Sequence, residues 1–136
     1  MRLRQRGAAA IEFALVLPLY VLVVDGVMEF SLVLYDQAIV LNAAREAVRA
    51  GVVVSDPKLT NAAIAAVAQT YAVGYLLSYD NTHAVTVVVN QTAGGAYQTP
   101  LTVSVAFTYT SLLAGSFLAA IQLPVVLSSS VTGFNE

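Results

Sequence analysis

One carboxylate in this sequence stands out because of its surroundings. Glu12 lies near the start of an apolar run from Ala8 to Val24 that is otherwise interrupted only by Pro18. A lone charge inside a lipid-spanning helix is costly, so such an acid indicates a functional site with a partner of its own. If the chain is cut after Gly7, the new α-amine on Ala8 lies about 6 Å along the helix axis from Glu12. That amine could neutralise the carboxylate within one subunit or between neighbouring subunits.

The apolar run that carries this acid is long enough to cross a membrane. It covers about 17 residues, or about 20 when it is extended to Met28, and a span needs about 20. Arginines at positions 2, 4 and 6 precede it. Because basic residues favour the cytoplasmic side, we expect a single pass with a cytoplasmic N-terminus and an extracytoplasmic C-terminal part. The alternatives are an uncleaved signal anchor and a secretory signal peptide, but the latter should be shorter and end at a small-x-small site.

The composition fits one small domain with a membrane anchor. The 136 residues are 58% hydrophobic and 10% charged, with a formal net charge of −2, which attracts neither nucleic acid nor anionic lipid. The sequence has no cysteine, which excludes disulfides, thiolate metal sites and cysteine nucleophiles. It also has no nucleophile elbow, phosphate-binding glycine loop or cluster of metal ligands. We therefore expect no enzyme activity, no catalytic residue, no cofactor and no metal.

A long helix is predicted from Ala9 to Ala50, with Gly51 as its C-cap. Its length of about 63 Å is roughly twice a membrane thickness. We therefore expect a membrane anchor at about 8–28 that continues as a stalk at about 29–51. Pro18 is expected to kink this helix, because it removes one backbone hydrogen bond.

Charged residues on the outer part of this helix are candidates for contacts with a partner. Asp25, Glu29 and Asp36 project within about 40° of one another. They are expected to form an acidic stripe, either a solvated face or a docking site for basic residues of another subunit. Arg45 and Arg49 lie one turn apart near the helix end, where the helix dipole favours cations. A contact with a partner is the alternative role for these two arginines.

Residues 52–136 are expected to form an extracytoplasmic α+β head. A second helix is predicted from Asp56-Pro57 to about Leu77. Three strands of an antiparallel sheet are predicted after it, at 84–90, 101–109 and 124–132. The apolar stretch 112–127 is too short and too broken for a second span, so we expect a loop or short helix there. The predicted fold class is α+β, with a long N-terminal transmembrane helix, a second helix and a small three-stranded antiparallel sheet.

Several stretches of the first helix resemble a known family. Gly7, four small or apolar residues and then Glu12-Phe13 resemble the cleavage motif of Flp-type prepilins, which prepilin peptidase cuts after the glycine. The segments Leu15-Val-Leu-Pro18, Met28-Glu29-Phe30 and Asn42-Ala-Ala-Arg45-Glu46-Ala-Val-Arg49-Ala resemble the TadE-like minor pseudopilins of the tight-adherence pilus. The likeness covers roughly residues 6–51.

The resemblance implies a minor structural subunit of a tight-adherence (Flp, type IVb) pilus machine in the bacterial inner membrane. Residues 1–7 would be a leader removed between Gly7 and Ala8, and the subunit would then prime or cap the pilus. Glu12 and Phe13 would serve recognition by the peptidase, and Glu12 would also set subunit register. The implied partners are prepilin peptidase, other pilins or pseudopilins, the inner-membrane assembly platform and membrane lipid. The alternative is a single-pass, membrane-anchored extracytoplasmic binding domain that is not processed as a prepilin.

Overall fold

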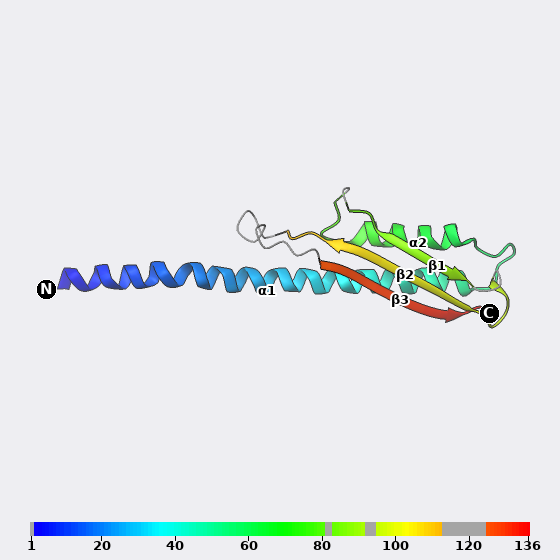
Figure 1. Cartoon of the computed structure of the whole chain (residues 1–136), viewed down its shortest axis with the longest axis horizontal. Coiled ribbons are helices and arrows are strands. Elements are labelled where there is room, and N and C mark those ends of the chain that lie inside the picture. Colours follow the sequence, from blue (N-terminus) through cyan, green and yellow to red (C-terminus); the bar gives the residue numbers. More distant parts are fainter. Residues whose placement is uncertain (1, 81–82, 92–94, 113–124) are drawn as a thin grey trace.

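The computed structural model describes residues 2–80, 83–91, 95–112 and 125–136, with side chains from Gly7 onward. Figure 1 shows a long helix that extends far beyond a small head of one further helix and three strands. The elements are α1 (Arg2–Val52), α2 (Asn61–Tyr75), β1 (Thr86–Gln91), β2 (Pro100–Tyr109) and β3 (Val125–Phe134). The predicted α+β fold is confirmed.

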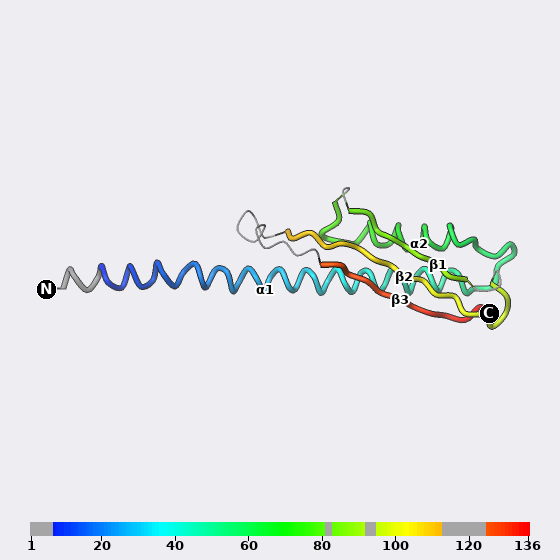
Figure 2. The backbone as a smooth tube through the Cα atoms, viewed as in Figure 1, coloured from blue at the N-terminus to red at the C-terminus, as the bar shows by residue number. Residues whose placement is uncertain are grey.

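Helix α1 is one continuous helix of 51 residues, longer at both ends than predicted. It passes through Pro18 without interruption, and Figure 2 shows its backbone as a straight rod. The expected kink is therefore absent. A proline removes one hydrogen bond, and here intact turns on both sides of Pro18 continue the helix.

Gly51 is not the C-cap that the sequence suggested. It lies in the last turn of α1, which ends at Val52. A Cβ atom on Gly51 would lie 2.5 Å from Leu101 Cδ2 and 2.8 Å from Ile64 Cδ1. The glycine is needed because the end of α1 approaches β2 and α2 closely, and no left-handed turn is involved.

Helix α2 begins later than predicted. Thr60 is its N-cap, and the Thr60 Oγ1 accepts a hydrogen bond from the Ala63 N–H at 3.2 Å. The predicted start, Asp56-Pro57, lies in the loop before it, and the helix ends at Tyr75 instead of Leu77. The apolar face that packs on the head begins only beyond this cap, with the buried residues Ile64, Ala68 and Ala72.

The sheet is antiparallel in the order β1-β2-β3. The pairing of β2 with β3 runs without a break from Pro100↔Phe134 to Tyr109↔Val125. The pairing of β1 with β2 runs from Thr86↔Ala106 to Gln91↔Leu101. All three predicted strands are present, and no strand end differs from its predicted position by more than two residues.

Both helices cover the same face of the sheet. The apolar side of β2 is buried against them, and the alternation predicted for this strand is confirmed. The facing residues of α1 include Val40, Ala43, Ala44, Ala47 and Val48. The segment predicted as a separate stalk at 29–51 thus supplies much of the core of the head. Without α1, a large part of the apolar surface of the sheet and α2 would be exposed to water.

The predicted loop or short helix at 112–127 falls almost entirely on residues 113–124, outside the described residues.

Candidate functional site

The N-terminal part of α1 extends away from the head, and most of its side chains are exposed between Gly7 and Tyr35. Large apolar side chains more than half exposed there include Ile11, Phe13, Leu15, Leu19, Tyr20, Val21, Val27 and Phe30. From Gly7 to Val52, α1 is long and apolar enough to cross a membrane, and its most apolar window has a mean hydropathy of 2.2. An apolar surface of this extent indicates a membrane anchor or contact with other apolar helices.

The predicted processing residues lie together on this exposed rod. No heavy atom lies within 4 Å of the position that a Cβ atom on Gly7 would take, apart from the helix's own nearby backbone. Ala8 follows it, and Glu12 and Phe13 lie about one turn further along the same helix, with Phe13 64% exposed. The Glu12 carboxylate makes no hydrogen bond or ion pair with the part of the chain whose side chains are described. Its partner must therefore come from outside the described residues.

The three acids predicted to form one stripe have three different environments. Asp25 is half-buried on the rod. The Glu29 Oε1 accepts hydrogen bonds from the Tyr109 hydroxyl at 2.9 Å and from the Leu112 N–H at 3.3 Å. Asp36 is fully buried. Only Asp25 remains a candidate from this stripe for a contact of the kind that was predicted.

The assignment of Asp36 to an exposed or docking stripe is therefore wrong. Asp36 Oδ1 accepts a hydrogen bond from the Leu77 N–H at 3.0 Å, and Oδ2 accepts one from the Ser78 N–H at 3.2 Å. The Ser78 hydroxyl donates to the same Oδ2. These donors belong to the segment immediately after α2, so the Asp36 side chain on α1 holds that segment against α1. A buried carboxylate is stable when hydrogen bonds of this kind replace its hydration.

The contact between Glu29 and Tyr109 joins the membrane-side end of the head to α1. Burial raises the pKa of the Tyr109 hydroxyl, and the hydrogen bond to the Glu29 carboxylate and its negative charge raise that pKa further. The phenol therefore stays protonated at neutral pH and continues to donate. Glu29 acts here as an internal acceptor, which the helical spacing of the acids did not predict.

Arg45 and Arg49 lie on the exposed surface of α1. Arg45 Nη1 lies 3.5 Å from Asn42 Oδ1, and Arg49 Nη1 lies 4.0 Å from Glu46 Oε2. The Arg49 side chain is 81% exposed. Exposed pairs with this geometry contribute little to stability, so both guanidinium groups are accessible to another molecule. Their role as partner contacts stays a prediction.

Two further side chains attach α1 to the head and were not predicted. Gln37 Nε2 donates to the Ser128 carbonyl of β3 at 3.0 Å. Lys58 Nζ donates to the carbonyls of Val52 at 3.3 Å and Val53 at 3.1 Å. A cation is favourable there because the helix dipole leaves negative charge at the end of α1. A lysine six residues after the end of α1 lies close enough in sequence to be a usable signal, whereas Gln37 and Ser128 are 91 positions apart.

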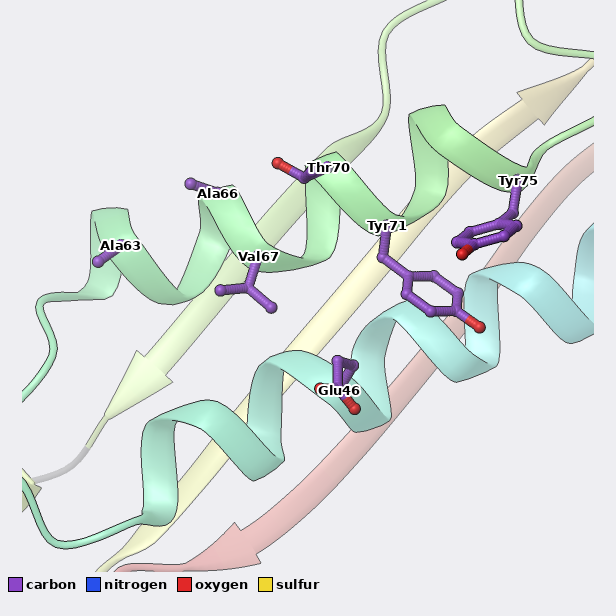
Figure 3. A pocket seen from close by; sticks show the side chains of 7 residues that line it. All are labelled: Glu46, Ala63, Ala66, Val67, Thr70, Tyr71 and Tyr75. Atoms are coloured by element: carbon purple, nitrogen blue, oxygen red, sulfur yellow. The ribbon is translucent and has the colours of Figure 1, made fainter.

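An open groove of about 450 Å³ lies between α1 and α2, and Figure 3 shows the side chains along it. Its lining consists of Glu46, Ala63, Ala66, Val67, Thr70, Tyr71 and Tyr75. The rings of Tyr71 and Tyr75 lie with their centroids 4.8 Å apart. Within the described residues, no group of three or more histidine, cysteine or acidic side chains could hold a metal ion. The groove therefore offers apolar contact and one carboxylate.

The comparison with known families places its match on the exposed helix and its continuation into the head. Residues 7–49 match the family of TadE-like proteins. The TadE-like match begins at the predicted cleavage glycine and ends at Arg49, so it lies entirely within α1. The resemblance inferred from the sequence is thereby confirmed for residues 7–49. No curated protein and no solved structure matches the chain.

Proposed function

We propose that this TadE-like chain is a minor pseudopilin, a structural subunit that primes or caps the tight-adherence (Flp, type IVb) pilus. The observation that carries this proposal is Glu12, an acid on an apolar helix of membrane length without a partner among the described residues. The TadE-like match over the same helix supports it. In this role the chain is a substrate of prepilin peptidase and a building block, and it is not itself an enzyme.

Cleavage between Gly7 and Ala8 would supply the cation that Glu12 lacks. An α-amine has an ordinary pKa of about 8, so the new terminus is largely protonated at neutral pH. It lies about 6 Å along the axis from Glu12 on the same chain. Between chains, the same attraction sets the stagger of neighbouring helices, because the terminus of one must lie level with Glu12 of the next. The attraction is stronger in lipid than in water because the surrounding dielectric constant is lower.

The position of Gly7 suits a protease that must open the helix. Gly7 lies within α1, close to its N-terminal end. A glycine inside a helix is about 1 kcal/mol less favourable than an alanine. Local unwinding therefore costs least at the bond that is to be cut, and the exposed Phe13 can help to anchor the peptidase one turn and a half further along.

The proposed topology follows from the charges that flank the helix. The arginines at positions 2, 4 and 6 keep the leader in the cytoplasm, and the head then lies outside the bacterial inner membrane. The anchor at about 8–28 inserts among lipid and the helices of other pilins or pseudopilins. The cytoplasmic leader faces the peptidase, and the anchor is available to the assembly platform.

Mass spectrometry of the protein isolated from its native membrane tests the processing step. We expect an N-terminus at Ala8, and we expect Gly7→Ala to stay uncut. Gly26→Ala is the matched control, because Gly26 lies on the same helix and also has open space around it. An N-terminus at Met1 would favour an anchored binding domain that is not processed, and normal processing of Gly7→Ala would contradict the proposal.

The role of Glu12 is tested separately by its incorporation into assembled pilus complexes. Glu12→Gln keeps the size of the side chain and removes its charge, so we expect the fraction of the protein that is cleaved to stay in the membrane without incorporation. Glu46→Gln, an equivalent change on the exposed surface of the head, serves as the control and should be incorporated normally. Incorporation of Glu12→Gln at the unmodified level would refute the proposed pairing.

A further inference from the structure

The sheet of the head has two edges with unpaired backbone groups. Among the described residues, strands β1 and β3 each pair only with β2. Every second residue of each edge strand therefore turns its N–H and C=O away from the sheet. Among the described residues, Gln37 provides a hydrogen bond to one β3 carbonyl, that of Ser128, and no such side-chain donor reaches the backbone of β1.

Neither edge strand carries a charged residue, a proline or a bulge, three features that usually prevent strands from pairing between molecules. Proteins protect such edges with charged side chains, prolines, bulges or a covering segment. The strands β1 and β3 contain no charged residue and no proline. The pairing of β3 with β2 runs through ten consecutive residues without a bulge. Residues 59–136 contain two charged residues, Asp80 and Glu136, and neither lies in a strand.

The direction of α1 restricts which edges can meet. Figure 1 shows the strands running along the length of α1. An antiparallel pairing of β3 with a second β3, or of β1 with a second β1, would turn one molecule upside down. The two membrane helices would then point in opposite directions, which is impossible for copies inserted the same way in one membrane.

The remaining combinations are parallel pairings. A parallel pairing of like edges would put the two helix layers on opposite faces of the shared sheet, whereas a parallel pairing of unlike edges keeps both layers on one face. Both β1 and β3 run antiparallel to β2, so they run in the same direction as each other. We infer that β1 of one copy pairs with β3 of a second copy of this chain, so that the two heads share a continuous sheet. The inference rests on the proposed function only for the common orientation of the copies. Contacts of this head-to-tail kind lead to rings or helical arrays.

The helix layer is compatible with this contact. Figure 3 shows α2 over β1 and α1 over the other two strands, so both helices stay on one face of the shared sheet. At the junction, α2 of one copy comes next to α1 of its neighbour. Helix α2 contains no charged residue, and its exposed face can therefore be covered without burying an unpaired charge.

Cysteine cross-linking tests the pairing, because the natural sequence has no cysteine. Val88 on β1 and Ser130 on β3 are both exposed, and both pair with Ser104, so they lie on the same face of the sheet away from the helices. Full-length Val88→Cys and Ser130→Cys chains with different tags are co-expressed in the bacterial inner membrane and treated with a short bismaleimide. We expect a cross-linked heterodimer at least tenfold more abundant than the homodimer of either variant alone.

A charge on the edge provides a second test that does not depend on the position of the first label. In an Asn90→Cys background on β1, Val88→Lys should reduce cross-linking to Ser130→Cys at least fivefold, whereas Val88→Thr should leave it unchanged. Homodimers of Ser130→Cys or Val88→Cys at the heterodimer level would overturn the inference, and so would the absence of any cross-link.

The same cross-linking in the Gly7→Ala background separates this inference from the proposed processing. In that background the leader stays attached while the anchor still orients the head, so the heterodimer should persist. Failure of processing and failure of sheet pairing are thereby distinguished.

Discussion

Replacing Asp36 with alanine tests how the head is attached to the long helix α1. The carboxylate is fully buried and accepts hydrogen bonds from the Leu77 N–H and from the N–H and hydroxyl of Ser78. Ser78 is 2% exposed, so both of its donors would lose their acceptor away from water. Leu77 is 52% exposed, and its N–H can be hydrated instead. The cost of the substitution therefore comes mainly from Ser78.

The magnitude follows from these two donors. Each buried donor left without a partner costs about 1–3 kcal/mol, so we expect Asp36→Ala to lower the free energy of unfolding of the head by about 2–6 kcal/mol. For a domain of 60–100 residues, each kcal/mol lowers the melting temperature by about 4–8 °C. The melting temperature should therefore fall by at least about 8 °C. Asp36→Asn retains one acceptor oxygen and nearly the same volume, and it should cost about half as much.

Thermal unfolding in detergent, followed by the near-ultraviolet circular dichroism of the tyrosines, reports on the head rather than on the micelle-bound helix. Asp56→Ala is the control, because Asp56 lies in the exposed loop before α2 and should change stability by less than about 0.5 kcal/mol. Ser78→Ala removes only the hydroxyl donor and should cost about 1–2 kcal/mol. If Asp36→Ala were no more destabilising than Asp56→Ala, the carboxylate would not hold the head to α1.

Two further predictions concern packing and pH. Gly51→Ala should destabilise the head by about 1–3 kcal/mol, because its methyl group would collide with Leu101 and Ile64. Gly74→Ala, which meets nothing within 4 Å, should instead stabilise it by up to about 1 kcal/mol, and similar urea midpoints for the two variants would contradict this. The raised pKa of Tyr109 means that its contribution to stability is fully present below the ordinary pKa of about 10 and is lost as pH rises toward the folded value. Urea unfolding at pH 9 to 11 should therefore show a smaller alkaline loss of stability for Tyr109→Phe than for the natural protein, and equal losses would exclude this role.

The secondary structure could be largely predicted because its signals are local. The apolar run of α1 and the alternation over 101–109 depend on neighbouring residues alone. The errors arose where two local signals competed or where tertiary packing decided. The N-cap of helix α2 lies at Thr60 and not at Asp56-Pro57, because the buried apolar residues of the helix lie beyond Thr60. Gly51 looked like a helix terminator, but the close approach of Leu101 and Ile64 explains it.

The candidate site was predictable only in part, for the same reason. Gly7, Glu12 and Phe13 form a contiguous motif, so they can be selected without knowledge of the fold. The hydrogen-bond partners of the other acids, Asp36 and Glu29, are residues that are distant in sequence. Asp36 meets Ser78, 42 positions later, and Glu29 meets Tyr109, 80 positions later. Helical spacing placed these two acids on one face correctly, but it could not show that the head covers that face.

The absence of a break in α1 has a mechanical consequence. The helix from Gly7 to Val52 has 46 residues, which at 1.5 Å per residue make a stiff lever of about 69 Å. If such a lever leans by 20°, an ordinary inclination for a membrane helix, its far end is displaced sideways by about 24 Å, relative to an upright one. Because the helix has no break that could absorb the movement, rocking at its N-terminal end is transmitted in full to the head at its other end.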